Sequence, residues 1–296
     1  MRLVTFTRGK TIGIGVLDEK GERIVDLARA AGVAADMTAF VALGKMGLAA
    51  ARAALKKPPK RSIMPLGKAR LLAPFPRPRR NIFCVGKNYH DHVAELNRSG
   101  FDGVASAAVP EYPILFTKMT TAVIGPGATI PAYLDPTQSV DYEGELAVVI
   151  GRGGRDIKKR DAFKHVYGYT IINDVTSRTQ QQRYGQWFLG KSVDGFCPMG
   201  PWLVTADEVG DVTQIGLETR FNGEVRQKAK VSDLIFDIPT LIEAISLGRT
   251  LEPGDLIATG TPSGVGLGFK PPKFLKKGDV VAITFDRIGT LENKVG

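Results

Sequence analysis

The chain has 296 residues, of which 43% are hydrophobic and 24% are charged. This length fits one large domain, or a large domain with a small companion. The composition excludes a disordered, collagen-like or disulfide-stapled protein. The net charge of +10, from 40 basic and 30 acidic residues, makes a binder of nucleic acid or of an anionic surface one hypothesis to weigh.

Cysteine usage and hydropathy bear on the compartment. Cys84 and Cys197 lie in unrelated apolar contexts without a CxxC or Cys/His cluster, so neither a zinc site nor a disulfide is expected. Arg8 and Lys10 interrupt the first apolar run, and no stretch approaches the ~18 apolar residues that span a bilayer. We therefore expect a cytoplasmic protein with no export signal and no membrane helix.

The first 80 residues differ in character from the rest. Three short alternating runs between residues 2 and 27 predict a β-meander. An alanine-rich helical patch follows over residues 46–55, and then a basic segment, 56–80, whose prolines would interrupt any helix or central strand. We expect a small N-terminal β-rich domain (1–55), a linker (56–80) and a catalytic domain (81–296).

From residue 81 onward, short apolar strands alternate with Gly/Pro turns, and helical patterns are few, chiefly near residues 90–96, 175–184 and 238–247. Many strands with few intervening helices disfavour a doubly wound sheet and favour a β-rich barrel, roll or sandwich. The expected fold class is α+β, predominantly β.

The basic excess is concentrated in the predicted linker. Residues 56–80 carry nine basic residues and no acid, so the other 271 residues together carry only +1. A nucleic-acid binder would spread its cations over a folded face with aromatic residues between them. We therefore expect no nucleic-acid partner, and we interpret the excess as a solvated linker that helps to attract small dianionic substrates.

Glu143 and Glu145 lie two residues apart in VDYEGELAVVIG, so on a strand both carboxylates project from one face. Gly144 between them leaves the backbone open to close approach. A solvated strand face is the simpler interpretation. However, residues 146–150 are the apolar run of a buried strand, where two carboxylates are costly unless a cation joins them.

Asp174 stands in the same situation, at the end of the apolar run YTIIN. Three carboxylates without Cys or His form a hard-oxygen set that suits Mg²⁺, Mn²⁺ or Ca²⁺ and suits Zn²⁺ poorly. If the next segment is helical, Arg178 and Gln181 share the face of Asp174, and Arg178 could hold a substrate carboxylate. The alternative for Arg178 is an ordinary Asp–Arg helix pair.

Four further side chains have reactive surroundings. His92 and Glu95 are neighbours on a helix in HDHVAE, a spacing that fits a general-base pair, although a polar helix surface is an equal alternative. Lys191 lies between apolar residues, where its ammonium could meet an anion away from water. The loop TGTPSGVG presents Thr261 and backbone N–H groups to an anion, and no helix follows that would make it a dinucleotide motif.

Six motifs in order, spread over residues 81–296, resemble the fumarylacetoacetate hydrolase family, and more closely its acylpyruvase-like branch. They are NYHDHVAE, PILFTK, VDYEGELAVVIG, YTIINDVTSRTQQQ, GKSVDGFCPMGP and TGTPSGVG. The N-terminal meander is similar to the leading domain of bacterial members. The resemblance implies a mixed β-roll or barrel, usually homodimeric, with Mg²⁺ or Mn²⁺ held by three carboxylates.

The resemblance also implies roles for individual residues. These are metal ligands at Glu143, Glu145 and Asp174, catalytic residues at His92, Glu95 and Lys191, and substrate-binding residues at Arg178, Gln181 and Thr261. The implied function is a metal-dependent hydrolase that cleaves a C–C bond of an acylpyruvate, such as fumarylpyruvate or maleylpyruvate, in the catabolism of aromatic or related compounds. The alternative is an isomerase or decarboxylase of a related 2-oxo or 2-hydroxydienoate diacid, such as 2-hydroxyhepta-2,4-diene-1,7-dioate or oxaloacetate.

Overall fold

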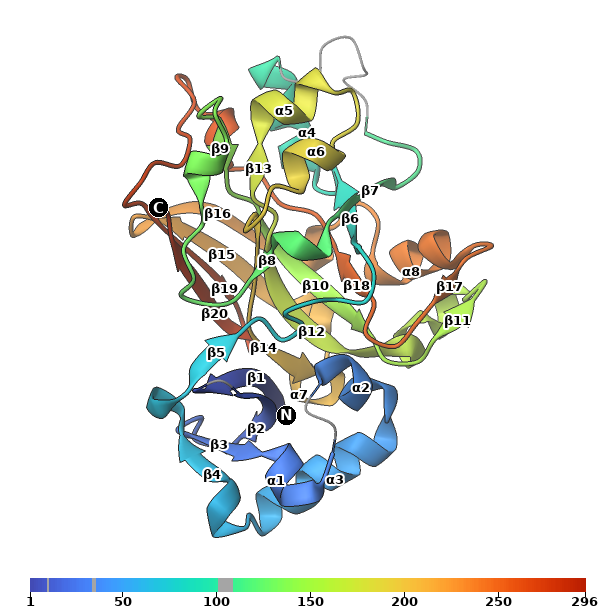
Figure 1. Ribbon diagram of the computed structural model, residues 1–296. Coiled ribbons are helices and arrows are strands. Elements are labelled where there is room, and N and C mark those ends of the chain that lie inside the picture. Colours follow the sequence, from blue (N-terminus) through green and yellow to red (C-terminus); the bar gives the residue numbers. More distant parts are fainter. Residues whose placement is uncertain (10, 34–35, 101–108) are drawn as a thin grey trace.

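A twelve-stranded mixed sheet organises the computed structural model, which describes residues 1–9, 11–33, 36–100 and 109–296 (Figure 1). Its main path runs β4-β3-β2-β1-β14-β12-β10-β18-β6-β7, with β5 beside β1 and β8 beside β14. The strands are β1 (Arg2–Arg8), β2 (Thr11–Leu17), β3 (Arg23–Asp26), β4 (Ile63–Pro65), β5 (Arg70–Leu72), β6 (Ile82–Gly86), β7 (Ile114–Lys118), β8 (Val123–Ile124), β10 (Gly144–Ile150), β12 (Val166–Asn173), β14 (Cys197–Thr205) and β18 (Leu256–Ala258).

A second, four-stranded antiparallel sheet in the order β16-β15-β19-β20 packs against the first. Its strands are β15 (Gly216–Phe221), β16 (Glu224–Lys230), β19 (Val280–Phe285) and β20 (Gly289–Lys294). Strand β10 is buried on both faces: Leu146 and Val148 share a core with Leu217 of the second sheet, whereas Ala147 shares a core with Phe40 of the N-terminal region. This double burial explains the unbroken apolar run of β10.

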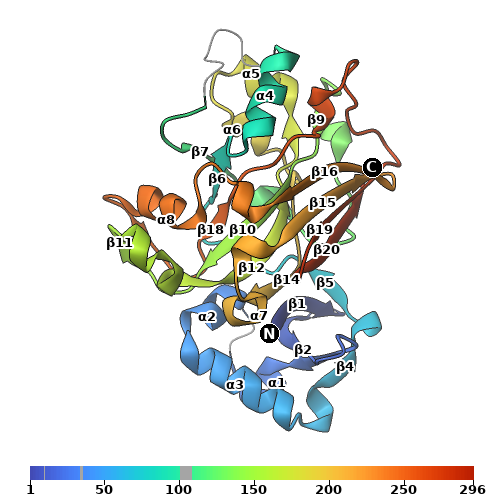
Figure 2. The same cartoon turned by 180° about the vertical axis from the view of Figure 1, so that it is seen from behind.

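Helices cover the two ends of the sheet (Figures 1 and 2). They are α1 (Leu27–Ala31), α2 (Met37–Ala42), α3 (Lys45–Lys56), α4 (His90–Ser99), α5 (Arg178–Arg183), α6 (Phe188–Lys191), α7 (Ala206–Val209) and α8 (Ile238–Ser246). In both views α1–α3 lie at the end that holds the N-terminus, and α4–α6 lie together at the opposite end. The expected mixed, predominantly β class is confirmed.

One predicted helix begins later than expected. Residues 175–184 were expected to be helical throughout, but Thr176–Ser177 form strand β13, which pairs with β9 (Val140–Asp141), and α5 begins only at Arg178. Pairing with β9 holds the backbone of β13 extended. Because β9 is distant in sequence, a local sequence pattern does not predict this pairing. A second two-stranded pair joins β11 (Gly154–Arg155) to β17 (Thr250–Leu251).

Part of the segment expected to be a linker is folded. Strand β4 pairs with β3, and β5 pairs with β1, so both add to the N-terminal strands. One linker charge is also partnered, because Arg80 forms two hydrogen bonds with the Asp255 carboxylate, at 3.0 and 2.7 Å. These contacts do not decide where domains begin and end, and the limits 1–55, 56–80 and 81–296 stay a prediction.

Two simpler expectations concern the cysteines and the membrane. Cys84 and Cys197 are both buried and unpaired, as expected, and burial raises the pKa of both thiols. No helix in the described ranges has the length and apolar character needed to cross a bilayer.

Candidate metal centre and active-site cavity

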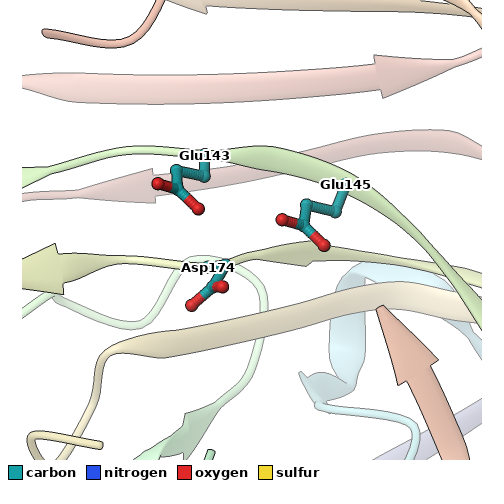
Figure 3. A group of neighbouring side chains, drawn as sticks. All are labelled: Glu143, Glu145 and Asp174. Atoms are coloured by element: carbon teal, nitrogen blue, oxygen red, sulfur yellow. The ribbon is translucent and has the colours of Figure 1, made fainter. Parts of the chain in front are cut away.

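The register of two neighbouring strands brings the three predicted metal ligands together. In the antiparallel pair of β10 and β12, Gly144 lies opposite Asn173, and the Asp174 backbone N–H donates to the Glu143 carbonyl at 2.8 Å. Glu143 and Glu145 project from the same side of one strand, and Asp174 faces them from the next (Figure 3). One carboxylate oxygen from each of the three lies within 4.8 Å of the others.

Gly144 is needed between the two glutamates. A Cβ atom at this position would lie 2.4 Å from the Thr219 Oγ1 atom, so only glycine fits without displacing the second sheet. The Thr261 hydroxyl donates to the Gly144 carbonyl at 3.1 Å and accepts a hydrogen bond from Gln227 Nε2 at 2.8 Å. The close approach predicted at Gly144 is therefore confirmed, and it fixes Thr261 beside the carboxylates.

Burial and charge act differently on the two glutamates. Burial, together with the negative charges of Asp174 and Glu143, raises the pKa of Glu145 well above its usual range. Burial also opposes ionisation of Glu143, but the nearby charges of Lys191 and Arg178 outweigh it and lower its pKa to about 2. The negative charge of Glu143 is thus balanced by protein cations, whereas an additional positive charge would be needed to stabilise ionised Glu145.

Two buried lysines contact the carboxylates. The Lys191 ammonium donates to Glu143 at 2.7 Å and to Asp174 at 2.9 Å, as expected of an ammonium that meets anions away from water. The Lys118 ammonium donates to the other oxygen of Asp174 at 2.6 Å and to the Val175 carbonyl at 3.0 Å. Lys118 was not among the predicted site residues, although its position at the end of the apolar run ILFT was a usable signal.

Arg178 contacts carboxylates other than the one expected. Its Nε donates to Asp141 at 2.9 Å, and its Nη1 lies 2.6 Å from Glu143, so an Asp174–Arg178 helix pair is wrong. Gln181 accepts from Arg178 Nη1 at 3.2 Å. Asp141 was missed, although Asp141, Glu143 and Glu145 recur at every second position in DYEGE and so predict a row of three acids.

His92 and Glu95 are in contact on α4. The His92 Nδ1 lies 3.0 Å from Glu95 Oε2, and the Gly264 N–H donates to the other Glu95 oxygen at 2.8 Å. Both side chains are buried, whereas His90, two residues earlier, is exposed. A solvated polar helix surface is therefore wrong for this pair. Glu95 fixes the imidazole through Nδ1, which leaves Nε2 as the nitrogen that can exchange a proton with a ligand.

These groups surround one small cavity, with a volume of about 20 Å³. Seven of the nine predicted site residues line it, and Glu95 and Asp174 lie behind them; the seven are His92, Glu143, Glu145, Arg178, Gln181, Lys191 and Thr261. Lys87 and Trp187 also line it and were missed. Lys87 is a buried non-glycine residue at φ 55°, and such left-handed conformations often occur at functional sites.

The carboxylate cluster fits a hard divalent cation. Its donors are all oxygens, which suits Mg²⁺ or Mn²⁺. Four buried carboxylates (Asp141, Glu143, Glu145 and Asp174) face three buried cations (Lys118, Arg178 and Lys191), so ionised Glu145, whose pKa is raised, would bring one negative charge in excess. Because an uncompensated buried charge is costly, a divalent cation between the three ligands would stabilise the cluster and leave it positive toward an anionic substrate.

Substituting Gly268 by alanine is expected to displace Glu95. The new Cβ would lie 2.0 Å from a Glu95 carboxylate oxygen, and Glu95 is held by both His92 and Gly264. If the pair moves a proton in the reaction, kcat should fall at least ~10-fold, with metal affinity unchanged in calorimetry. Gly67→Ala, at a position with nothing within 4 Å, is the matched control. Normal kcat in Gly268→Ala would contradict a precise role for Glu95.

Known proteins are similar to this chain in both sequence and fold. Residues 81–296 match the model of the fumarylacetoacetate (FAA) hydrolase C-terminal family. Oxaloacetate tautomerase YisK of Bacillus subtilis is 52% identical over 231 residues, which are 78% of this chain and 74% of that protein.

Two solved structures span the whole chain. A fumarylacetoacetate hydrolase from psychrophilic Exiguobacterium antarcticum is 40% identical with a TM-score of 0.82, covering 100% of this chain and 99% of that one. A maleylpyruvate hydrolase from Sphingobium sp., solved with manganese(II) and pyruvate, is 31% identical with a TM-score of 0.79, covering 100% and 98%. With the family model covering residues 81–296, the chain belongs to the fumarylacetoacetate hydrolase family.

Proposed function

We propose that this protein is a divalent-metal-dependent keto–enol tautomerase of a small 2-oxo diacid of the oxaloacetate type. The observation that carries the proposal is that one small cavity brings the carboxylate cluster, two cations and the His92–Glu95 pair together. The 52% identity to an oxaloacetate tautomerase favours this isomerase chemistry over the acylpyruvate hydrolysis that the sequence analysis placed first.

Glu143, Glu145 and Asp174 would hold Mg²⁺ or Mn²⁺, the cations that an all-oxygen site prefers. When bound, such a cation supplies Lewis-acid polarisation of a 2-oxo carbonyl. Lys191 orients Glu143 and Asp174 through its two hydrogen bonds. Arg178 is clamped by Asp141 and Glu143, so its guanidinium presents a fixed positive edge to the cavity for the substrate's carboxylate.

His92 is the group that moves the proton. Tautomerisation transfers a proton between C3 and the oxygen on C2, so it needs one residue able to accept and return a proton near neutral pH. His92 lines the cavity, and Glu95 accepts from its Nδ1 and stabilises the imidazolium that forms. We propose that His92 Nε2 takes the C3 proton of the keto form and delivers it to the C2 oxygen, which gives the enol; in the other direction it takes the oxygen-bound proton and returns it to C3.

The charge of the cavity supports a diacid. Lys87, a buried lysine on the cavity wall, adds positive charge for a second carboxylate. A 2-oxo diacid, which carries one carboxylate beside its oxo group and a second at its far end, matches this arrangement.

Hydrolysis of an acylpyruvate is the second candidate. The His92–Glu95 pair could equally deprotonate a water molecule, and the chain is 31% identical, over its whole length, to a maleylpyruvate hydrolase. Decarboxylation would use the same enolate but would release CO₂.

A substrate comparison separates these activities. The purified protein with Mg²⁺ is mixed with freshly dissolved enol oxaloacetate, and loss of the enol absorbance is followed alongside CO₂ and pyruvate release. We expect the enol to decay faster than in protein-free Mg²⁺ buffer without matching CO₂. In a parallel assay, maleylpyruvate and fumarylpyruvate should yield pyruvate far more slowly. Rapid cleavage of either acylpyruvate, with enol decay at the buffer rate, would favour the hydrolase.

We further propose, from the family resemblance, that the protein is a homodimer whose ligands are small anionic 2-oxo acids and not nucleic acid. Light scattering on the eluted protein should give twice the 31.9 kDa chain mass. Duplex DNA at low salt should show no binding, because a nucleic-acid binder would bind most tightly under those conditions.

A further inference from the structure

A second cleft lies at the opposite end of the β10–β12 pair from the carboxylates. Glu143 precedes β10 and Asp174 follows β12, whereas Gly151, just after β10, and Tyr167, near the start of β12, line this cleft. Helix α3 contributes the facing residues, and Figure 1 shows it near that end of the sheet. The cleft has a volume of about 760 Å³, and the proposed reaction makes no use of it.

The cleft is positively charged. Lys45 and Arg52 of α3, Arg152 after β10, and Lys164 line it together with one carboxylate, that of Asp207. Arg52 pairs with Asp207 at 2.7 Å, and Lys164 pairs with Asp161 at 2.6 Å. Within the described ranges, neither Lys45 nor Arg152 has a carboxylate within ion-pair distance, so their charge is available to a ligand.

A buried hydroxyl in the same cleft lacks a partner. Tyr167 is only 7% exposed, and its hydroxyl oxygen makes no hydrogen bond to the described residues. Buried tyrosine hydroxyls usually find a partner. Burial raises the pKa of Tyr167, so the group stays a neutral hydrogen-bond donor. The hydroxyl oxygen has less than 1 Å² of accessible surface, so it is the rest of Tyr167, and not this hydroxyl, that a ligand in the cleft can contact.

The remaining walls are apolar, formed by Leu48, Val166 and Ala206 beside Tyr167. Binding sites for organic ligands combine apolar walls with a few convergent polar groups in this way. We propose that this cleft is a second ligand site for a small organic anion, a phosphate or carboxylate attached to an apolar body. Arg152 and Lys45 bind the charged head, and the apolar walls contact the body.

Calorimetric titration of the full chain with phenyl phosphate tests the proposal. The buffer has low ionic strength and contains EDTA, so that no metal recruits the probe to the carboxylate cluster. We expect one equivalent to bind, with inorganic phosphate and benzyl alcohol each at least ~10-fold weaker. Benzoate in place of phenyl phosphate tells whether the site prefers a carboxylate. Undetectable binding of both phenyl phosphate and benzoate, or equal binding of inorganic phosphate, would overturn the proposal.

Variants locate the bound probe. Arg152→Gln should weaken binding ~10-fold by removing one charge, and Lys45→Gln should weaken it about threefold or more. Both residues are exposed, so neither substitution should lower the melting temperature. Arg79→Gln, at an exposed arginine outside the cleft, should change nothing. Binding that survives both cleft substitutions would place the probe elsewhere and overturn the site. Because no turnover is measured, the result is independent of the proposed reaction.

Discussion

Glu145→Gln is expected to abolish the stabilisation that Mg²⁺ or Mn²⁺ gives to the protein and to remove catalysis with it. The substitution keeps the size of the side chain but removes one ligand charge, so metal affinity should fall at least ~100-fold. At a metal concentration ~100 times the wild-type Kd, a ~100-fold loss of affinity removes about 2.3 kcal/mol of the stabilisation that the metal gives. Melting curves recorded with and without metal measure the difference directly.

The metal-free variant should be no less stable than the wild type. Burial and the charges of Asp174 and Glu143 already penalise ionised Glu145, so glutamine relieves repulsion. Glu143→Ala is a poorer test, because it removes one of the two carboxylates that hold each of the buried cations Lys191 and Arg178, so a loss of stability would mix with the loss of metal. Glu19→Gln, at an exposed residue, controls for the loss of one acid. A full metal-induced shift in Glu145→Gln would remove Glu145 from the ligand set.

His92→Gln is expected to lower kcat by ~10²–10⁴-fold, the usual contribution of a positioned acid or base. Metal affinity should remain within twofold, because His92 is not among the three clustered ligands. Steady-state kinetics together with metal titration separate the two effects.

The chain provides its own control for this substitution. His90 lies two residues earlier on α4 and is exposed, whereas His92 is buried against Glu95. His90→Gln should therefore retain wild-type kcat. Equal kcat in the two variants would mean that His92 moves no proton in the rate-limiting step.

Local patterns were sufficient to predict most of the site. The ExE spacing at Glu143 and Glu145 predicts two carboxylates on one face, and the i, i+3 spacing of His92 and Glu95 predicts their contact. Asp174 could be named because it ends an apolar run. That it meets Glu143 depends on the β10–β12 register, which a single sequence does not determine.

The missed contacts depend on tertiary structure. Lys118 reaches Asp174 across 56 residues of sequence, and Arg178 reaches Asp141 across 37. The start of α5 was placed too early because β13 pairs with β9, which is distant in sequence. The charge of the 56–80 segment was evident from the sequence, but its pairing with the N-terminal strands was not. A proline-rich composition indicates that a segment forms no helix or central strand, but it does not indicate which strands the segment pairs with.

Deuterium exchange at C3 of oxaloacetate tests metal-dependent enolisation at this site most directly. Oxaloacetate is dissolved in D₂O, and proton NMR measures how fast the C3 hydrogens are replaced. Wild-type protein with Mg²⁺ should accelerate exchange above the rate in protein-free Mg²⁺ buffer. EDTA, Glu145→Gln and His92→Gln should each remove that acceleration. Exchange at the buffer rate with the wild-type protein, or acceleration that survives EDTA, would contradict enolisation at the carboxylate cluster.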